Sequence, residues 1–317
     1  MSEMNYNLMV CVRCYTYNQE RYIGRTLEGI VTQQTNFPFV VVVVDDASTD
    51  NNATIIRDYE EKYPDIVKAT YLKENHYRQN KPKRAYVQQW EDQSKYVAYC
   101  EGDDYWTDPL KLQKQVDFLE SHPDYSMVCH NWNVQNGDEI YPSDVQRKYN
   151  QAFSYTFATL PWIWITKTLT VLVRRSAIDY DAFKPFKWAR DVHIIYFALK
   201  KGKGYFMPDV MATYRITDGG IWSKVDVNQK NKLTYDLYKE LYSFEPNKAV
   251  RKRYMNATLA YYNGLAFGKR TWWHFGTNAK LYFEALRNIS DAKDLIFCLG
   301  ALVPTSMVKW VMKTFKV

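Results

Sequence analysis

The first 100 residues alternate short apolar runs with longer stretches of helical periodicity. The apolar runs lie at residues 8–14, 37–44, 67–72 and 96–100, and each ends in polar residues. The run at 37–44 consists almost entirely of Val and Phe, which is typical of a central parallel strand covered on both faces. Helices are predicted between these strands, for example over residues 52–63. This order predicts an α/β fold with a mostly parallel central sheet.

Beyond residue 100 the elements become irregular, and the last third of the chain is helical. Further predicted elements are a helix beginning at Asp108-Pro109 and the segments 126–131, 168–174, 191–201 and 210–216. From Asn228 onward the sequence is rich in Lys and Tyr and has no strand pattern. We therefore expect an α/β domain over residues 1–226 and a helical, basic extension over residues 227–317.

Polar side chains collect where the predicted strands end. Tyr15 to Asn18 follow the first strand, and Asp45-Asp46 follow the second. In open α/β sheets this carboxyl edge is where ligands bind. Taken alone, Asp45-Asp46 fits a strand-end turn as well as a contact with the base or ribose of a nucleoside. The neighbouring loop at residues 15–18 favours the second interpretation, because both loops would border one crevice.

The fourth predicted strand ends in an acidic cluster, Glu101-Gly102-Asp103-Asp104. Three carboxylates within four residues repel one another unless a cation neutralises them. Their hard oxygen ligands favour Mg²⁺ or Mn²⁺, which could bridge a diphosphate as it departs. A solvated acidic turn is the alternative, and the flanking residues Tyr99, Tyr105 and Trp106 weigh against it. The cluster therefore predicts a divalent metal site.

The net charge of +7 is unevenly distributed along the chain. Residues 228–317 carry 15 Lys and Arg against 6 Asp and Glu, whereas residues 1–227 carry 27 against 29. A basic segment suits nucleic acid or an anionic membrane surface. No nucleic-acid-binding motif accompanies it, so we expect no nucleic-acid partner and favour peripheral membrane contact.

Targeting signals and disulfides are not expected. The polar N-terminus does not resemble a signal peptide, and no apolar run reaches the roughly 18 residues of a membrane-spanning helix. Cys11 and Cys14 form an isolated CxxC whose members would lie on opposite faces of a strand. We expect five reduced, buried thiols and a cytoplasmic location, peripheral on the inner face of the cell membrane if the basic extension binds there.

Three motifs in this order resemble family 2 glycosyltransferases of the GT-A-type fold. They are Tyr-Thr-Tyr-Asn-Gln at 15–19, Val-Asp-Asp-Ala-Ser-Thr-Asp at 44–50 and Glu-Gly-Asp-Asp-Tyr-Trp-Thr-Asp-Pro at 101–109, with further matches at 111–115, 214–216 and 219–223. The resemblance covers roughly residues 8–223 and is greatest to bacterial members that build capsule, exopolysaccharide or lipopolysaccharide glycans. It implies transfer of a sugar, with inversion, from a nucleotide-diphosphate sugar such as a UDP-sugar to a glycan or lipid-linked glycan hydroxyl.

The resemblance also implies donor-side roles for individual residues. Thr16 and Tyr17 would line the nucleoside pocket, and Asp46 would contact the base. Of the basic residues Lys81, Lys83 and Arg84, we choose Arg84 as the one near the diphosphate. Within the acidic cluster, Asp103 would lie by the ribose or sugar, Asp104 would be the principal metal ligand and Glu101 would support it.

On the acceptor side, the resemblance assigns the catalytic base to Asp191, at the start of a predicted helix. A helix N-cap is the simpler interpretation of the same residue. Arg215 and Trp222 would face phosphate or acceptor, although both could simply pack. Thr217 stands where related sequences often carry a His, so that either Asp218 replaces it or the metal relies on Asp104, phosphate and water.

Two other functions remain open. The residue at Thr217 motivates a catalytically silent nucleotide-sugar-binding or scaffold protein of a polysaccharide assembly complex. A sugar-phosphate nucleotidyltransferase is disfavoured, because the first strand is not followed by a Gly-rich basic loop. The amphipathic segment from Trp272 to Phe315 fits an interfacial membrane helix, packing against the catalytic domain, or a homodimer contact.

Overall fold

The computed structural model describes residues 6–160, 164–186, 191–217, 225–265 and 272–302, without the side chains of 272–277, 293, 297 and 300. The described chain divides into two compact units. The first contains all the strands and the helices up to α6, and the second contains helices α7 to α10.

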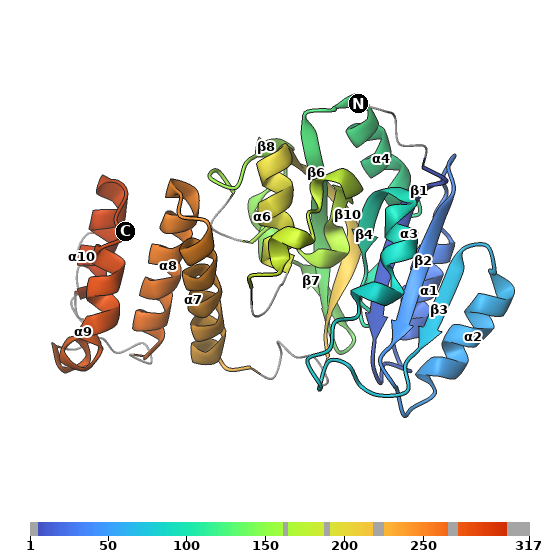
Figure 1. The fold of residues 1–317 in the computed structure, drawn as a ribbon, viewed down its shortest axis with the longest axis horizontal. Coiled ribbons are helices and arrows are strands. Elements are labelled where there is room, and N and C mark those ends of the chain that lie inside the picture. Colours follow the sequence, from blue (N-terminus) through green and yellow to red (C-terminus); the bar gives the residue numbers. More distant parts are fainter. Residues whose placement is uncertain (1–5, 161–163, 187–190, 218–224, 266–271, 303–317) are drawn as a thin grey trace. The chain divides into compact units, whose positions relative to one another are not determined.

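The first unit is built on one sheet with the strand order β3-β2-β1-β4-β9-β6-β10-β5 (Figure 1). Strands β1 (Leu8–Thr16), β2 (Phe39–Asp45), β3 (Val67–Tyr71) and β4 (Ser94–Tyr99) pair in parallel. Strand β9 (Leu172–Arg174) runs antiparallel to β4 and to β6 (Tyr125–Asn136). Strand β10 (Lys203–Ile216) pairs in parallel with β6 and antiparallel with β5 (Tyr105–Trp106). The predicted mostly parallel α/β sheet is confirmed.

Short elements complete this unit. They are α1 (Ile23–Val31), α2 (Asn52–Lys62), α3 (Gln88–Asp92), α4 (Lys111–Ser121), α5 (Asp144–Lys148), α6 (Asp191–Lys201), β7 (Glu139–Pro142) and β8 (Phe153–Tyr155). The core follows from the apolar pattern, because every residue of β2 is buried and α1 packs Ile23, Leu27 and Ile30 inward.

Three predicted boundaries differ from the structure for local reasons. Helix α4 begins at Lys111 instead of Pro109, since the Asp108 carboxylate accepts from the Leu110 N–H and holds a turn before the helix. The predicted strand 168–174 opens with a 3₁₀ turn at Thr168–Thr170. Strands β6 and β10 are longer than predicted, because they pair with each other along most of their length despite three register shifts, two of which lie between Met207 and Ala212.

The second unit contains α7 (Val227–Phe244), α8 (Lys248–Leu265), α9 (Trp272–Leu286) and α10 (Ala292–Leu302). Its own small core includes Met255, Leu259, Tyr262 and Tyr282. The predicted helical extension is confirmed, and the boundary between residues 226 and 227 stays a prediction. All five cysteines are free thiols in buried positions. None of the helices in the described segments has the length and apolar character needed to cross a bilayer.

Candidate functional site

The predicted polar loops meet at the carboxyl edge of the sheet. Thr16 at the end of β1 lies opposite Asp45 at the end of β2. The acidic turn after β4 runs along the other side of β1, where the Cys100 N–H donates to the Arg13 carbonyl (3.0 Å) and the Gly102 N–H to the Tyr15 carbonyl (3.0 Å). Residues separated by almost 90 positions in the sequence thereby border one site.

The two nucleoside-side loops are tied to each other. Asn18, in the left-handed region with φ of 50°, donates its N–H to Ser48 Oγ (2.9 Å), and its side-chain oxygen accepts from the Thr49 N–H (2.8 Å). The Asp45 carboxylate accepts from the Ser48 N–H (3.0 Å) and holds the turn. Thr16 is buried against Gln19 and Asn52, whereas the half-buried Tyr17 ring lies 5.5 Å from the Arg78 guanidinium. Their contact with a nucleoside stays a prediction.

Gly102 allows the acidic turn to approach the end of β1. A Cβ atom at this position would lie 2.6 Å from Thr16 Oγ1 and would also collide with the Gln19 side chain. On the other side, the Thr26 hydroxyl of α1 contacts the carbonyl oxygens of Gly102 (2.9 Å) and Asp104 (2.6 Å). The turn is therefore held between β1 and α1, and any larger residue would displace it.

The three carboxyl groups of the turn are in different surroundings. Asp104 is 3% exposed, and its Oδ1 accepts from the Arg215 N–H (2.9 Å). Burial, and then the charge of Asp103, raise the pKa of Asp104 well above its ordinary value. Burial also raises the pKa of Asp103, whose Oδ2 lies 3.4 Å from Thr217 Oγ1. The pKa of Glu101 rises to about 7, mainly through burial, with Arg13 opposing and Asp103 adding to the shift.

Arg215 anchors the acidic turn from β10. Its Nη1 donates to the Asp103 carbonyl (3.0 Å) and its Nε to Gln135 Oε1 (3.3 Å), and the guanidinium lies 4.2 Å from the centre of the Tyr105 ring. These contacts position the turn, and a contact of Arg215 with phosphate or acceptor stays a prediction. Trp222 and Asp218 lie outside the described residues.

Asp46 is engaged by the loop that follows β3. Its carboxylate is 1% exposed and accepts from the His76 N–H (2.7 Å), the Tyr77 N–H (3.1 Å) and Lys83 Nζ (2.8 Å). Burial by itself would raise the pKa of Asp46, but the hydrogen bonds from Lys83, His76 and Tyr77 outweigh it, so that the pKa falls. Asp46 is thus an ionised anchor of this loop, and its contact with a base stays a prediction.

The three competing basic residues face different partners. Lys81 pairs with the exposed Glu74, and the Arg84 guanidinium stacks 3.7 Å from the centre of the Tyr180 ring. Lys83 pairs with Asp46, and its charge also partly opposes the rise in the pKa of Glu101. The structure therefore brings Lys83 to the side of the acidic turn, and the assignment of Arg84 to the diphosphate stays a prediction.

Asp191 begins α6, as expected, and is partly exposed. Its Oδ1 accepts from the Val192 N–H (2.9 Å). The Asp191 charge contributes to the raised pKa of Glu101, which places its carboxylate within electrostatic range of the acidic turn. His193, two residues further on, is fully buried and packs near Phe183. The role of Asp191 as catalytic base stays a prediction.

Two basic residues near the acidic turn belong to none of the motifs found in the sequence. Arg13, inside β1, lies 3.5 Å from Glu91, and its charge partly opposes the rise in the pKa of Glu101. Lys167 lies 3.3 Å from the centre of the Tyr214 ring, and its charge partly opposes the rise in the pKa of both Asp103 and Asp104. Arg13 alternates with apolar residues in a buried strand and Lys167 lies in an irregular segment, so neither position stands out in the sequence.

A comparison with protein families identifies this arrangement. The model of "Glycosyl transferase family 2" matches residues 12–182, which is more than half of the chain and includes both polar loops and the acidic turn. The chain belongs to glycosyltransferase family 2. An uncharacterized protein of Mycobacterium bovis is 34% identical over 65% of this chain. The match covers 58% of that relative, so the chain spans less than two thirds of its length.

Other matches agree with this family and its fold. The putative teichuronic acid biosynthesis glycosyltransferase TuaG of Bacillus subtilis is 27% identical over 75% of this chain and 90% of its own length. The crystal structure of residues 1–349 of TarS from S. aureus, in complex with UDP-GlcNAc, superposes with a TM-score of 0.60 at 19% identity, covering 89% of this chain and 82% of that one. The fold of the first unit is accordingly the predicted GT-A type.

A divalent metal ion is general among glycosyltransferases of this type. No group of three His, Cys, Asp or Glu side chains in the described part of the chain is arranged as a complete metal site. The donor chemistry nevertheless suits an ion shared with the substrate, because Mg²⁺ commonly takes only one or two carboxylates together with phosphate oxygens and water. Burial raises the pKa values of Asp103 and Asp104, and the charge of Asp103 adds to the shift of Asp104, so that a cation at this turn would favour the ionised forms of both.

Proposed function

We propose that this protein transfers a sugar, with inversion, from a nucleotide-diphosphate sugar to the hydroxyl of a glycan or lipid-linked glycan in bacterial surface polysaccharide synthesis. The observation that carries the proposal is the buried acidic turn, which Gly102 and Thr26 hold between β1 and α1. A UDP-sugar is the donor we favour, and the TarS complex with UDP-GlcNAc supports this choice.

The donor would lie along the carboxyl edge of the sheet. In this proposal Thr16, Tyr17 and Asp46 border the nucleoside, and Asp103 faces the ribose or sugar. Asp104, with Glu101 in support, would hold Mg²⁺ or Mn²⁺, which supplies positive charge to the departing diphosphate.

Positive side chains would share that task. Lys83 and Lys167 each lie within electrostatic range of the acidic turn, on opposite flanks of the turn in sequence. Cations fixed in a partly buried site stabilise charge that develops on a leaving group. Arg84 is the other candidate for the diphosphate, although in this structure it stacks on Tyr180.

Asp191 is the proposed catalytic base. Its carboxylate would take the proton of the acceptor hydroxyl as the new glycosidic bond forms, while the bond to the diphosphate breaks on the opposite face of the sugar.

The acceptor class follows from the named relatives and from charge. TuaG is named for teichuronic acid biosynthesis, and TarS for transfer to poly(ribitol-phosphate). The helical extension of this chain is basic, with 15 Lys and Arg against 6 Asp and Glu from residue 228 onward. We propose an acidic surface glycan as the acceptor, with no nucleic-acid partner.

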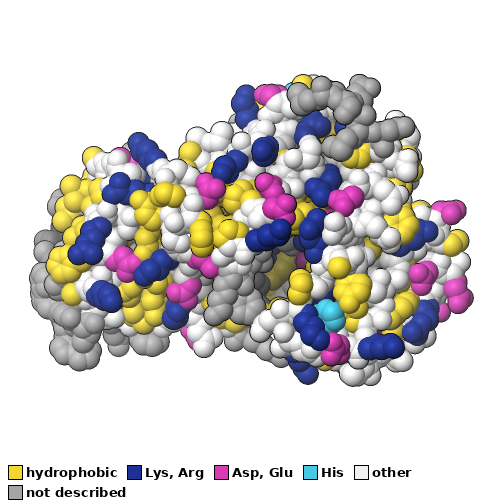
Figure 2. Space-filling model, in the orientation of Figure 1, with side chains coloured by type: hydrophobic (Ala, Val, Ile, Leu, Met, Phe, Trp, Pro, Cys, Tyr) yellow, Lys and Arg dark blue, Asp and Glu magenta, His cyan; other side chains and the backbone are white. Residues whose placement is uncertain are grey.

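The helical unit would also contact a membrane surface. Figure 2 shows hydrophobic side chains interrupted by Lys and Arg over these helices. Ile296 and Leu299 on α10 are 67% and 52% exposed. Basic and apolar side chains together favour the interface of an anionic bilayer, and a homodimer contact through the same face is the alternative.

Donor turnover by the purified chain tests the proposal. With Mg²⁺ or Mn²⁺ and a set of UDP-sugars, we expect release of UDP that increases when acidic glycan is added. Asp191→Asn should keep donor affinity within about twofold and lose transfer by at least about 100-fold, the usual contribution of a general base. The matched control is Asp138→Asn on an exposed turn.

The same assay distinguishes the transferase from the second candidate function. A catalytically silent nucleotide-sugar-binding or scaffold protein, motivated by Thr217, would bind UDP-sugar without releasing UDP. Failure to bind any nucleotide sugar would contradict both functions, and unchanged transfer by Asp191→Asn would remove this residue from the mechanism.

A further inference from the structure

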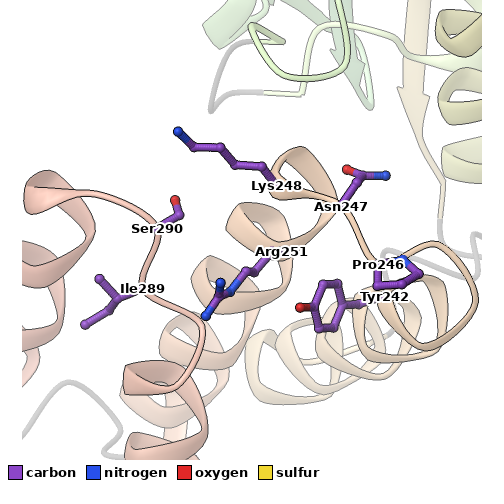
Figure 3. Close-up of a pocket in the computed structure, with 7 residues that line it drawn as sticks. All are labelled: Tyr242, Pro246, Asn247, Lys248, Arg251, Ile289 and Ser290. Atoms are coloured by element: carbon purple, nitrogen blue, oxygen red, sulfur yellow. The ribbon is translucent and has the colours of Figure 1, made fainter.

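The helical unit contains a cavity of about 400 Å³ that the proposed transfer reaction does not use (Figure 3). Tyr242 comes from the end of α7, Lys248 and Arg251 from the first turn of α8, and Ser290 from the loop between α9 and α10. The volume lies in the range of sites that hold small molecules, about 300–1,000 Å³. Figure 3 shows Lys248 and Arg251 extending from α8 toward the loop that carries Ser290.

The cavity carries positive charge that its own lining does not neutralise. None of the described residues that line it is acidic. Two carboxylates that follow Ser290 in the sequence are engaged by another residue, since Lys252 Nζ lies 2.9 Å from Asp291 and 3.4 Å from Asp294. Lys248 and Arg251 therefore present two cationic groups to the cavity.

Arg251 is held in place but not fully satisfied. Its Nη2 donates to the Arg287 carbonyl (2.6 Å), which fixes the guanidinium across the cavity wall. Its Nε is buried and has no hydrogen-bond partner in the described structure. A buried donor without a partner is uncommon and often indicates a ligand, ion or water at that place.

Two backbone N–H groups in the first turn of α8 already have hydrogen-bond acceptors. The Asn247 side chain accepts from the Val250 N–H (3.0 Å), and the Asn247 carbonyl accepts from the Arg251 N–H (2.9 Å). Binding in this cavity would therefore depend on side chains and would not come from a bare helix terminus.

An aromatic side chain completes the cavity. Tyr242 stacks on Tyr254 with ring centres 5.7 Å apart, and its hydroxyl points toward Arg251 in Figure 3. A ring with one packed face and a polar rim suits a saccharide, because sugars offer apolar C–H faces and hydroxyl groups together. Arginine and lysine beside it suit a phosphate or carboxylate.

We propose that this cavity binds an acidic sugar unit of the acceptor, with its phosphate or carboxylate between Lys248 and Arg251 and its ring against Tyr242. The inference rests on the proposed function in one respect, the glycan nature of the acceptor. Such a site, apart from the acidic turn, would retain an acidic polymer on the enzyme between transfer events.

Ligand-detected NMR titrations of the full chain test the proposal. The probes are glucose 1-phosphate, glucuronate, neutral glucose and inorganic phosphate, and UDP-GlcNAc is titrated separately. We expect the two acidic sugars to bind more tightly than glucose or phosphate. Lys248→Ala should weaken their binding about tenfold, the effect of losing one charged hydrogen bond. Lys280→Ala, which removes an exposed charge elsewhere on α9, should change nothing.

Three other outcomes would each overturn the proposal in a distinct way. Equal affinity of Lys248→Ala and the unaltered chain would exclude the cavity as the site. Phosphate binding as tightly as glucose 1-phosphate would exclude a sugar site. Lys248-dependent binding to vesicles of anionic phospholipid, without saccharide binding, would indicate a headgroup site instead. If the unaltered chain bound the acidic sugars but not UDP-GlcNAc, the result would count against the proposed transferase and not against this cavity.

Discussion

At the scale of single residues, the site depends on how closely backbone segments approach one another. The acidic turn fits beside β1 because residue 102 has no side chain and because Thr26 contacts two of its carbonyl oxygens. Arg215 then fixes Asp103 and Asp104 from β10. The carboxyl groups are thus positioned mainly by uncharged neighbours, and Arg215 is the charged residue among those that hold them.

Gly102→Ala should displace this turn. The added Cβ would collide with Thr16 and Gln19, so we expect a loss of about 1–3 kcal/mol in the free energy of unfolding, as in other overpacked sites. UDP-sugar affinity should also fall by about tenfold or more, as measured by calorimetry. Gly24→Ala in α1 is the matched control, since its nearest contact is an ordinary 3.8 Å and Ala is the better helix former. Equal behaviour of the two variants would contradict the account of Gly102.

At the scale of elements, helix α4 carries a buried cation behind the site. Lys111 is fully buried, its Nζ donates to Gln115 Oε1 (2.7 Å), and it lies 4.0 Å from the centre of the Trp106 ring. Gln115 in turn donates to the Thr170 carbonyl (2.9 Å), and Trp106 to the Leu169 carbonyl (3.0 Å). Through these contacts α4 and β5 hold the 3₁₀ turn at Thr168–Thr170, which directly follows Lys167.

The pH dependence of stability should reveal Lys111. Burial lowers its pKa to about 7, against about 10.4 in an unfolded chain. Between these values the unfolded state binds the proton more strongly, so the contribution of Lys111 to stability rises with pH. Relative to Lys111→Met, the unaltered chain should gain stability from pH 7 to 9.5 in denaturant titrations.

A second lysine on the same helix provides the control for this measurement. The hydrogen bond from Lys114 to Asp108 raises the pKa of Lys114, so its protonation does not change over that range in either state. The difference between Lys114→Met and the unaltered chain should therefore stay constant from pH 7 to 9.5. A constant difference for Lys111→Met as well would show that Lys111 does not titrate as described.

At the scale of the whole molecule, a basic helical extension accompanies the glycosyltransferase unit. Each unit has its own core, one around β1 and β2 and the other around Met255 and Tyr282. The extension exposes large apolar side chains on α10. Membrane contact is therefore a property to test on the complete chain.

The double variant Ile296→Ser with Leu299→Ser should weaken binding to vesicles of anionic phospholipid. Removing two exposed apolar side chains takes away the part of the affinity that depends on buried apolar area. Co-sedimentation measures vesicle binding. The control is Ile140→Ser, because the Ile140 side chain on β7 of the first unit is 54% exposed. Unchanged sedimentation together with a lower molecular mass in solution would indicate a homodimer contact instead.

The sequence alone determined the sheet, its ligand-binding edge and the acidic turn, because these depend on local patterns. A run such as residues 39–45 forms a buried strand wherever it is placed, and parallel strands bring their polar ends to one edge. The local pattern did not indicate Asp191, which was assigned only through the resemblance to the family.

Only the tertiary structure decided which partners the cations near that edge contact. Lys81, Lys83 and Arg84 are equivalent in sequence, and the loop after β3 turns Lys83 to Asp46 while Arg84 meets Tyr180. The charge of Lys167 acts on Asp103 and Asp104, and three separate segments line the cavity beside Arg251. These arrangements depend on contacts between residues far apart in the chain, which no local pattern of apolar and polar positions encodes.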